Sequence, residues 1–134
     1  MSADINSKNR PLKIVLVDDD KIVLQVHANI LKTIGHQPFS FEQPHDAADY
    51  LKQHGENINL IITDYKMPKM TGLELIRTVA KYGQAIPTLI LTAYPDDVDI
   101  EQATHYNTKV LAKPVRISLL TDHIRSSQLL PLVA

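Results

Sequence analysis

Five short apolar segments alternate with five segments of helical periodicity, and this alternation limits the fold more than any other feature of the chain. The apolar segments are residues 12–17, 37–41, 58–63, 87–91 and 108–112. The first of these segments is a nearly continuous apolar run. Such a run is typical of a strand that is covered on both faces, as in parallel sheets. Strict alternation of strands and helices predicts one parallel sheet with helices on both sides. Five units are too few for a closed eight-stranded barrel, so we expect an open α/β fold.

Glycine and proline punctuate the helical segments. Gly35, Gly55 and Gly83 stand where three helices are expected to end, because glycine is favoured just past a helix C-terminus. Pro131 cannot continue a helix, so the last helix should stop near Gln128. The expected helices are residues 23–34, 44–54 and 73–80, a short polar helix opened by Pro95, and a last helix that starts at Pro114.

Length and composition narrow the class of protein. A chain of 134 residues suits one domain, which we place at residues 11–128, between a flexible arm at 1–10 and a tail or linker start at 129–134. The net charge of −1 argues against direct nucleic-acid binding, and the absence of cysteine excludes disulfides and thiolate metal or redox sites. No apolar run is long enough to span a membrane and the N-terminus lacks signal-peptide features, so we expect a cytoplasmic protein.

Polar residues that suit a cation or a phosphate follow four of the predicted strands. In open α/β sheets ligands bind beyond the carboxyl ends of the strands, so these side chains should converge on one edge. Each residue alone has an ordinary structural explanation, because aspartate and threonine cap helices and lysine is commonly solvated. Several carboxylates held together stay ionised only when a cation joins them, and carboxylate oxygens suit Mg²⁺ (or Mn²⁺). The residues are Asp18, Asp19 and Asp20 after the first strand, Asp64 after the third, Thr92 after the fourth and Lys113 after the fifth.

This constellation resembles the receiver domain of two-component response regulators. The similarity covers about residues 12–128 and rests on four segments, which are Val-Asp-Asp-Asp at 17–20, Asp-Tyr-Lys-Met-Pro-Lys-Met-Thr-Gly at 64–72, Leu-Thr-Ala at 91–93 and Lys-Pro at 113–114. The resemblance implies a single doubly wound, flavodoxin-like α/β domain. Five helices would surround a five-stranded parallel sheet of strand order 2-1-3-4-5.

The resemblance also implies a metal site at this edge. Asp19 would be a direct Mg²⁺ ligand, with Asp18 as its water-mediated partner. Asp64 and the backbone carbonyl of Lys66 would supply further oxygens. Asp20 fits better as the N-cap of the first helix than as a ligand.

Asp64 is, by the same resemblance, the phosphoryl acceptor. Its carboxylate would act as a nucleophile and form an aspartyl phosphate. Lys113, the Thr92 hydroxyl and the Ala93 backbone N–H would hold phosphoryl oxygens. This set of groups suits phosphoryl transfer, which depends mainly on positioning and charge neutralisation.

The implied function is a signalling switch rather than an enzyme with a separate substrate. A sensor histidine kinase or a histidine phosphotransfer protein would donate the phosphoryl group. The self-catalysed steps would be limited to acceptance of that group and its hydrolysis. The phosphorylated domain would change a protein-interaction surface that is read by a downstream protein, by an effector domain missing from this chain, or by a second copy in a homodimer. No membrane partner is expected.

Two alternatives require different residues. A metal-dependent phosphatase with an aspartate nucleophile requires a second carboxylate two residues later, which acts as general acid and base. This chain has Lys66 at that position. A protein-binding module that works without phosphorylation predicts the loss of acceptor or metal residues, and none of them is lost.

Three positions near the expected site bear on how a receiver domain with this sequence would work. Receivers usually carry an aromatic residue three positions before the lysine, and Val110 stands there. Because valine has no ring to turn, we expect the loop after Thr92 and the polar helix behind it to carry the conformational change. Lys66 and Tyr94 each lie two residues after a site residue, so their side chains either flank the phosphoryl group or point to solvent. Our hypothesis is that Tyr94 shields the acyl phosphate from water.

Overall fold

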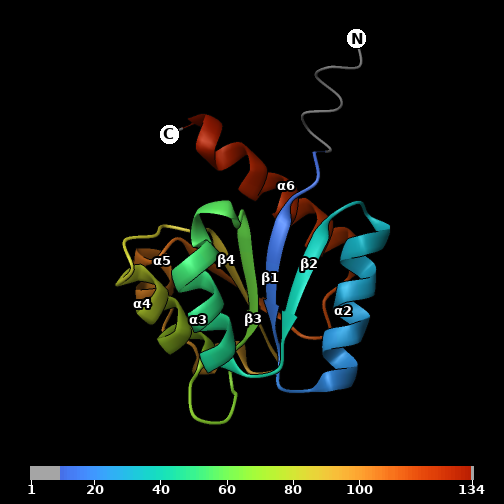
Figure 1. Ribbon diagram of the computed structural model, residues 1–134. Coiled ribbons are helices and arrows are strands. Elements are labelled where there is room, and N and C mark those ends of the chain that lie inside the picture. The colour runs from blue at the N-terminus through green and yellow to red at the C-terminus, as the bar shows by residue number, and fades with distance from the viewer. Residues whose placement is uncertain (1–9, 134) are drawn as a thin grey trace.

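One parallel sheet forms the centre of the molecule. The computed structural model describes residues 10–133, and side chains as far as residue 126, so the expected arm lies outside this range apart from Arg10. The strand order β2-β1-β3-β4-β5 confirms the predicted doubly wound arrangement (Figure 1). The strands are β1 (Lys13–Val17), β2 (Gln37–Phe41), β3 (Leu60–Asp64), β4 (Thr88–Thr92) and β5 (Thr108–Ala112).

Five α-helices and two short 3-10 helices connect the strands within the described part of the chain. Asp20, Thr71 and Asp99 each accept a backbone hydrogen bond at the start of the helix that follows, and Thr71 completes a capping box with Glu74. These caps fix where three helices begin. The helices are α2 (Lys21–Thr33), α3 (Pro44–His54), η1 (Gly55–Asn57), α4 (Gly72–Ala80), η2 (Pro95–Asp97), α5 (Ile100–His105) and α6 (Ile117–Val133).

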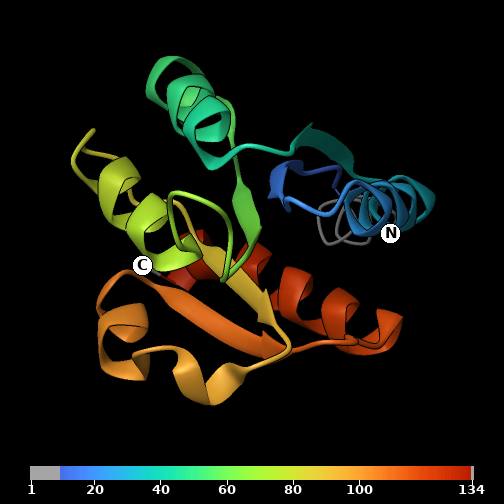
Figure 2. The same ribbon diagram turned by 90° about the horizontal axis from the view of Figure 1, so that it is seen from below.

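The helices cover both faces of the sheet. α2 and α6 lie on one face, and α3, α4 and α5 lie on the other (Figure 2). Successive residues of a strand point to opposite faces, so Ile14 and Leu16 pack with α2 and α6, while Val15 and Val17 pack with α3 and α4. Burial on both sides explains why the central strands are nearly continuous apolar runs. Polar residues are therefore left to the edge at which the strands end.

The boundaries of the last two helices differ from the sequence prediction. Pro95 opens η2, and α5 begins only at Ile100 because Asp99 caps it. α6 starts at Ile117 rather than at Pro114, since the intervening residues carry the chain from the end of β5 to the face that α6 covers.

The predicted end of the last helix near Gln128 is wrong, because α6 continues through Pro131 to Val133. A proline removes one backbone donor, and so close to the helix end few later residues depend on the turn that it disturbs. Of the three glycines expected at helix ends, Gly35 and Gly83 have positive φ angles of 97° and 78°, whereas Gly55 caps α3 in the right-handed helical conformation.

Candidate functional site

Three aspartates from neighbouring strands meet where the strands end. Asp18 and Asp19 follow β1, and Asp64 is the last residue of β3, the direct partner of β1. One carboxylate oxygen from each lies within 4.8 Å of the other two. Asp18 is only 2 % exposed, Asp64 is half-buried and Asp19 is open to solvent. The structure thus brings together three carboxylates that the sequence assigned to this edge.

Lys113 follows β5, the outermost strand on one side of the sheet, and its side chain joins this cluster. Its ammonium lies 3.0 Å from Oδ2 of Asp18 and 3.3 Å from Oδ1 of Asp64. Its backbone N–H donates to the Thr92 carbonyl at 2.7 Å, which fixes the start of the side chain beside β4. Three carboxylates and one ammonium leave the cluster with two negative charges, which a divalent cation would balance.

The cluster shifts the pKa values of two of its members. Burial raises the pKa of Asp64 above its usual value, against the attraction of Lys113, and the nearby charge of Asp18 adds to the rise. Burial alone would lower the pKa of Lys113, but its hydrogen bond and attraction to Asp18, reinforced by Asp64, raise it instead. Lys113 therefore stays charged, whereas Asp64 is the carboxylate that is costly to ionise without a cation.

Backbone groups orient the two inner carboxylates. Oδ1 of Asp64 accepts a hydrogen bond from the Tyr65 N–H at 2.8 Å, and Oδ1 of Asp18 accepts one from the Asp20 N–H at 2.9 Å. The Asp20 side chain points instead into the first turn of α2, where it accepts from the N–H groups of Ile22 and Val23. Asp20 is therefore a helix cap, as the sequence favoured, and stands outside the acidic cluster.

The acceptor loop, residues 65–71, is closed back on the end of β3. The Gly72 N–H donates to the Tyr65 carbonyl at 2.8 Å. A Cβ atom at position 72 would collide with the Asp64 carbonyl oxygen, so only glycine allows this approach. Lys66 lies in this loop, and its backbone carbonyl is the one expected to face a metal ion.

Thr92 occupies the corresponding position on β4. Leu91 is the register partner of Asp64, so Thr92 is one step beyond it at the same edge. The Thr92 side chain is 2 % exposed, and its Oγ1 accepts a hydrogen bond from the Tyr94 N–H at 3.0 Å. Its hydroxyl proton remains available to a phosphoryl oxygen. Ala93 is exposed beside it, in the turn that leaves β4.

The Lys66 side chain makes contacts that the sequence did not indicate. Its ammonium lies 3.0 Å from Oδ2 of Asp97 in η2 and 5.0 Å from the centre of the Tyr94 ring. The acceptor loop is thus tied to the loop that follows Thr92. The spacing of residues in the sequence does not predict this ion pair, because Asp97 is only one of several acidic residues near the expected start of a helix.

Val110 packs in a small cluster between β5 and the helices α4 and α5. Its neighbours include Tyr65, Tyr106, Ile76 and Val98. Tyr65, next to the acceptor position, is therefore in the same cluster as the residue that replaces the usual aromatic. α5 itself buries only Ala103 among its six residues, which leaves it weakly anchored.

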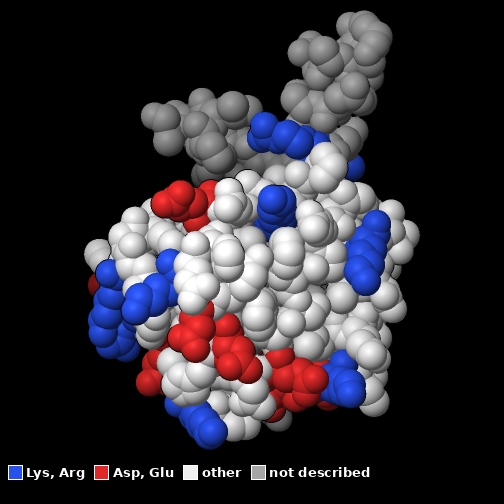
Figure 3. Space-filling view, in the orientation of Figure 1, with Lys and Arg blue, Asp and Glu red and all other residues white. Residues whose placement is uncertain are grey.

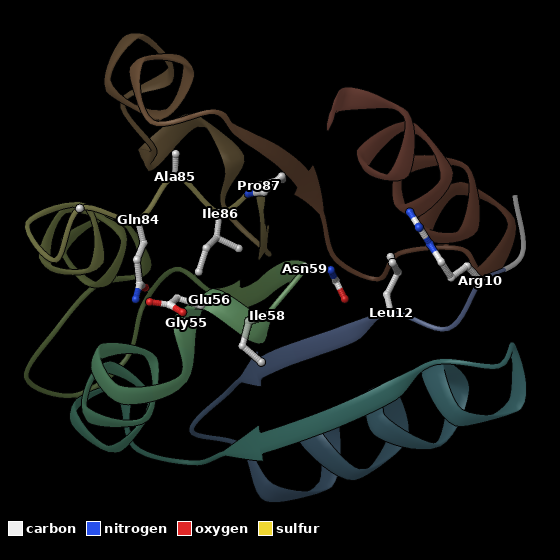
Figure 4. Close-up of a pocket in the computed structure, with 11 residues that line it drawn as sticks. Arg10, Leu12, Gly55, Glu56, Ile58, Asn59, Gln84, Ala85, Ile86 and Pro87 are labelled. Atoms are coloured by element: carbon white, nitrogen blue, oxygen red, sulfur yellow. The ribbon is translucent and has the colours of Figure 1, made fainter. Parts of the chain in front are cut away.

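The edge at which the strands begin carries a hollow rather than an acidic cluster. A hollow of about 380 Å³ opens there, and its lining includes Leu12, Glu56, Ile58 and Gln84 (Figure 4). Most acidic atoms visible in Figure 3 lie instead in the lower half of the molecule, toward the edge at which the strands end. The hollow is therefore separate from the aspartate cluster, and we assign it no role.

A comparison with protein families assigns the chain to one class. The model of the response regulator receiver domain matches residues 14–125. The chain therefore belongs to the response regulator receiver domain family, which confirms the resemblance and does not favour the phosphatase or the phosphorylation-independent module. Receiver domains are signalling modules that bind Mg²⁺ at an acidic cluster and work with histidine kinases or phosphotransfer proteins.

Relatives and solved structures agree with this family. The chain is 29 % identical over 131 residues to the two-component response regulator ARR15 of Arabidopsis thaliana, covering 88 % of this chain and 64 % of the relative. It is 28 % identical over 112 residues to ARR12 of the same plant, covering 83 % of this chain and 19 % of the relative. The chain thus spans less than two thirds of these relatives.

The fold matches solved receiver domains closely. A receiver domain from Clostridium thermocellum superposes with a TM-score of 0.84 at 24 % identity, over 91 % of this chain and 98 % of that one. A chain of the CheX–CheY–beryllium fluoride–Mg²⁺ complex from Borrelia burgdorferi superposes with a TM-score of 0.78 at 18 % identity, over 87 % of this chain and 88 % of that one. Among the described residues, no helix is long and apolar enough to cross a membrane.

Proposed function

We propose that this chain accepts a phosphoryl group on Asp64 and switches a protein-interaction surface in response. The observation that supports this most directly is the position of Lys113, which contacts both Asp18 and Asp64 inside the aspartate cluster. A cation that already neutralises two carboxylates is placed to neutralise the phosphoryl group that would arrive there.

The residues present suit a divalent cation. Asp18, Asp19 and Asp64 offer oxygen atoms within 4.8 Å of one another, and the Lys66 carbonyl would complete the protein ligands. The donor set is oxygen only and carries a net negative charge, which favours Mg²⁺ or Mn²⁺ over softer metals. The bound ion would supply neutralisation of the charge that builds up between acceptor and phosphoryl group.

Each protein group has a separate part in the transfer. An Asp64 carboxylate oxygen attacks the phosphorus of a phosphohistidine, so that a P–O bond forms as the P–N bond breaks. Lys113 pairs with one phosphoryl oxygen, the Thr92 hydroxyl donates to a second and the Ala93 N–H to a third. When water attacks the same phosphorus, a new P–O bond forms, the P–O bond to Asp64 breaks and inorganic phosphate leaves, which restores the Asp64 carboxylate. The chain catalyses both steps only on its own Asp64.

The phosphodonor is a sensor histidine kinase or a histidine phosphotransfer protein in this proposal. Two apolar side chains one turn apart on α2, Ile22 and Val26, are 73 % and 50 % exposed. Ile22 lies in the first turn of α2, three residues after Asp19, so a protein that delivers phosphate to Asp64 would cover it. The output would be a downstream protein, an attached effector domain or a homodimer, in a cytoplasmic setting without direct nucleic-acid contact.

Phosphorylation with a small donor tests the acceptor assignment. Incubation with Mg²⁺ and acetyl phosphate should add the mass of one phosphoryl group, stable in acid and labile in base. Asp64→Asn should abolish the addition, while Asp49→Asn, an exposed aspartate on α3, should leave it unchanged. Full labelling of the Asp64→Asn protein would show that another residue is the acceptor.

A further inference from the structure

The bridge between Lys66 and Asp97 spans two loops that both contribute to the site. Lys66 belongs to the acceptor loop, two residues after Asp64. Asp97 belongs to η2, five residues after Thr92. The 3.0 Å ion pair therefore connects the acceptor side of the site to the side that carries the phosphoryl-binding hydroxyl. Tyr94 supports it, because the same ammonium lies 5.0 Å from the centre of its ring.

The bridge is exposed and contributes little to the stability of the fold. The side chains of Lys66 and Asp97 are 62 % and 48 % exposed, and Tyr94 is 61 % exposed. An exposed ion pair of this kind contributes little to stability, because water and salt screen it. Lysine carries a compact charge on a flexible four-carbon stem, which allows it to swing between nearby anions.

We propose that the Lys66 ammonium is a second phosphoryl-binding cation, and that Asp97 competes with the phosphoryl group for it. The proposal rests on Asp64 as acceptor, as stated above. In the unphosphorylated chain Asp97 holds the ammonium at η2. When a phosphoryl group is present, its doubly charged oxygens offer Lys66 a stronger partner than the single charge of Asp97. The exchange strengthens phosphoryl binding and at the same time releases η2 from the acceptor loop.

A double-mutant cycle with a phosphoryl mimic measures this competition. The affinity for beryllium fluoride at saturating Mg²⁺ is obtained from the bound ¹⁹F resonance for the wild type, Asp97→Asn, Lys66→Met and the double variant. Asp97→Asn should raise the affinity about two- to five-fold, the effect available from an exposed ion pair, and Lys66→Met should lower it by a similar factor. In the Lys66→Met background, Asp97→Asn should have no further effect.

Two controls separate the exchange from general charge repulsion. Asp96→Asn removes a neighbouring exposed aspartate for which no ion pair is found among the described residues, and it should change the affinity little. High salt should reduce the difference between the wild type and Asp97→Asn. The exchange is overturned if Asp97→Asn has no effect, or if its effect persists without Lys66. If the wild type does not bind the mimic, or Asp64→Asn binds it equally well, the proposed function itself is wrong and this inference fails with it.

Discussion

Lys113 and Asp18 are hydrogen bonded at 3.0 Å, although 95 positions of sequence separate them and their strands are not neighbours in the sheet. The side chain of Lys113 reaches from β5 past β4 and β3 to the end of β1, and it contacts Asp64 on the way. A single ammonium thus holds the buried Asp18 carboxylate, which is only 2 % exposed. Several consequences of this arrangement are open to measurement.

Loss of Lys113 should destabilise the metal-free protein. Lys113→Met leaves the buried Asp18 charge without its partner, which we expect to cost about 1–3 kcal/mol of unfolding free energy. Mg²⁺ should recover part of this loss, since it supplies positive charge to the same carboxylates. Urea denaturation with and without Mg²⁺ measures both effects, and Lys109→Met, an exposed lysine on β5, serves as the matched control. Equal stability of the two variants would contradict the role given to Lys113.

Ionisation of Asp64 should oppose folding when no cation is present. Its pKa is raised by burial, so the folded protein binds the proton more tightly than the unfolded chain does. Its contribution to stability is therefore greatest below the ordinary value of 3.8 and is lost as the pH rises through the raised folded value. Asp64→Asn should be more stable than the wild type at neutral pH, and the difference should shrink toward pH 3.8 in metal-free denaturation experiments. A gain that is the same at both pH values would argue against this explanation.

The adjacent aspartates Asp19 and Asp20 should differ in their response to Mg²⁺. The ion should raise the melting temperature of the wild type, because it binds the folded state. Asp19→Ala should remove most of that increase. Asp20→Ala should lower the unfolding free energy by about 1 kcal/mol, because the α2 cap is lost, and the melting temperature should fall accordingly. Mg²⁺ should still raise the melting temperature of this variant. If both variants respond to Mg²⁺ alike, Asp19 is not the ligand.

Tyr94 should lengthen the lifetime of the aspartyl phosphate. Its ring lies 5.0 Å from the Lys66 ammonium and two residues after Thr92, and we expect it to keep water from the phosphorus. Tyr94→Ala should therefore dephosphorylate faster than the wild type, and Tyr94→Phe, which keeps the ring, should not. The measurement is the decay of phosphoprotein after removal of the donor. A half-life that is unchanged or longer in Tyr94→Ala rules out this shielding.

The conformational response should be concentrated in residues 92–104. This segment includes all of α5 except its last residue, and α5 buries only Ala103, so the local unfolding free energy of the segment should be low. Addition of beryllium fluoride should change amide hydrogen exchange across the segment, while Val110 should change little. Exchange that stays constant there while the mimic is bound would mean that the signal leaves by another route.

Local patterns predicted the alternation of strands and helices and the polar residues at the strand ends, whereas the strand order came from the resemblance to receiver domains. Strand β5, for example, has the predicted bounds of residues 108–112. Asp18 and Asp64 lie close together because β1 and β3 are neighbours in the sheet, and that adjacency was expected from the resemblance. The bridge from Lys66 to Asp97 was not predictable, since it depends on the paths of two loops in space. The end of α6 was mispredicted because the rule against proline in helices weakens near a terminus.

The closed acceptor loop divides the chain into positions of very different tolerance. Lys69, near the tip of the loop, already adopts a positive φ of 73°, and the hydrogen bond between Tyr65 and Gly72 holds the two ends together. An extra residue at this tip would lengthen a loop that is fixed at its base, and Asp64 would not move. A methyl group at position 72 would press directly on the backbone of Asp64. We therefore expect the tip to tolerate an inserted residue better than the base tolerates a single added carbon atom.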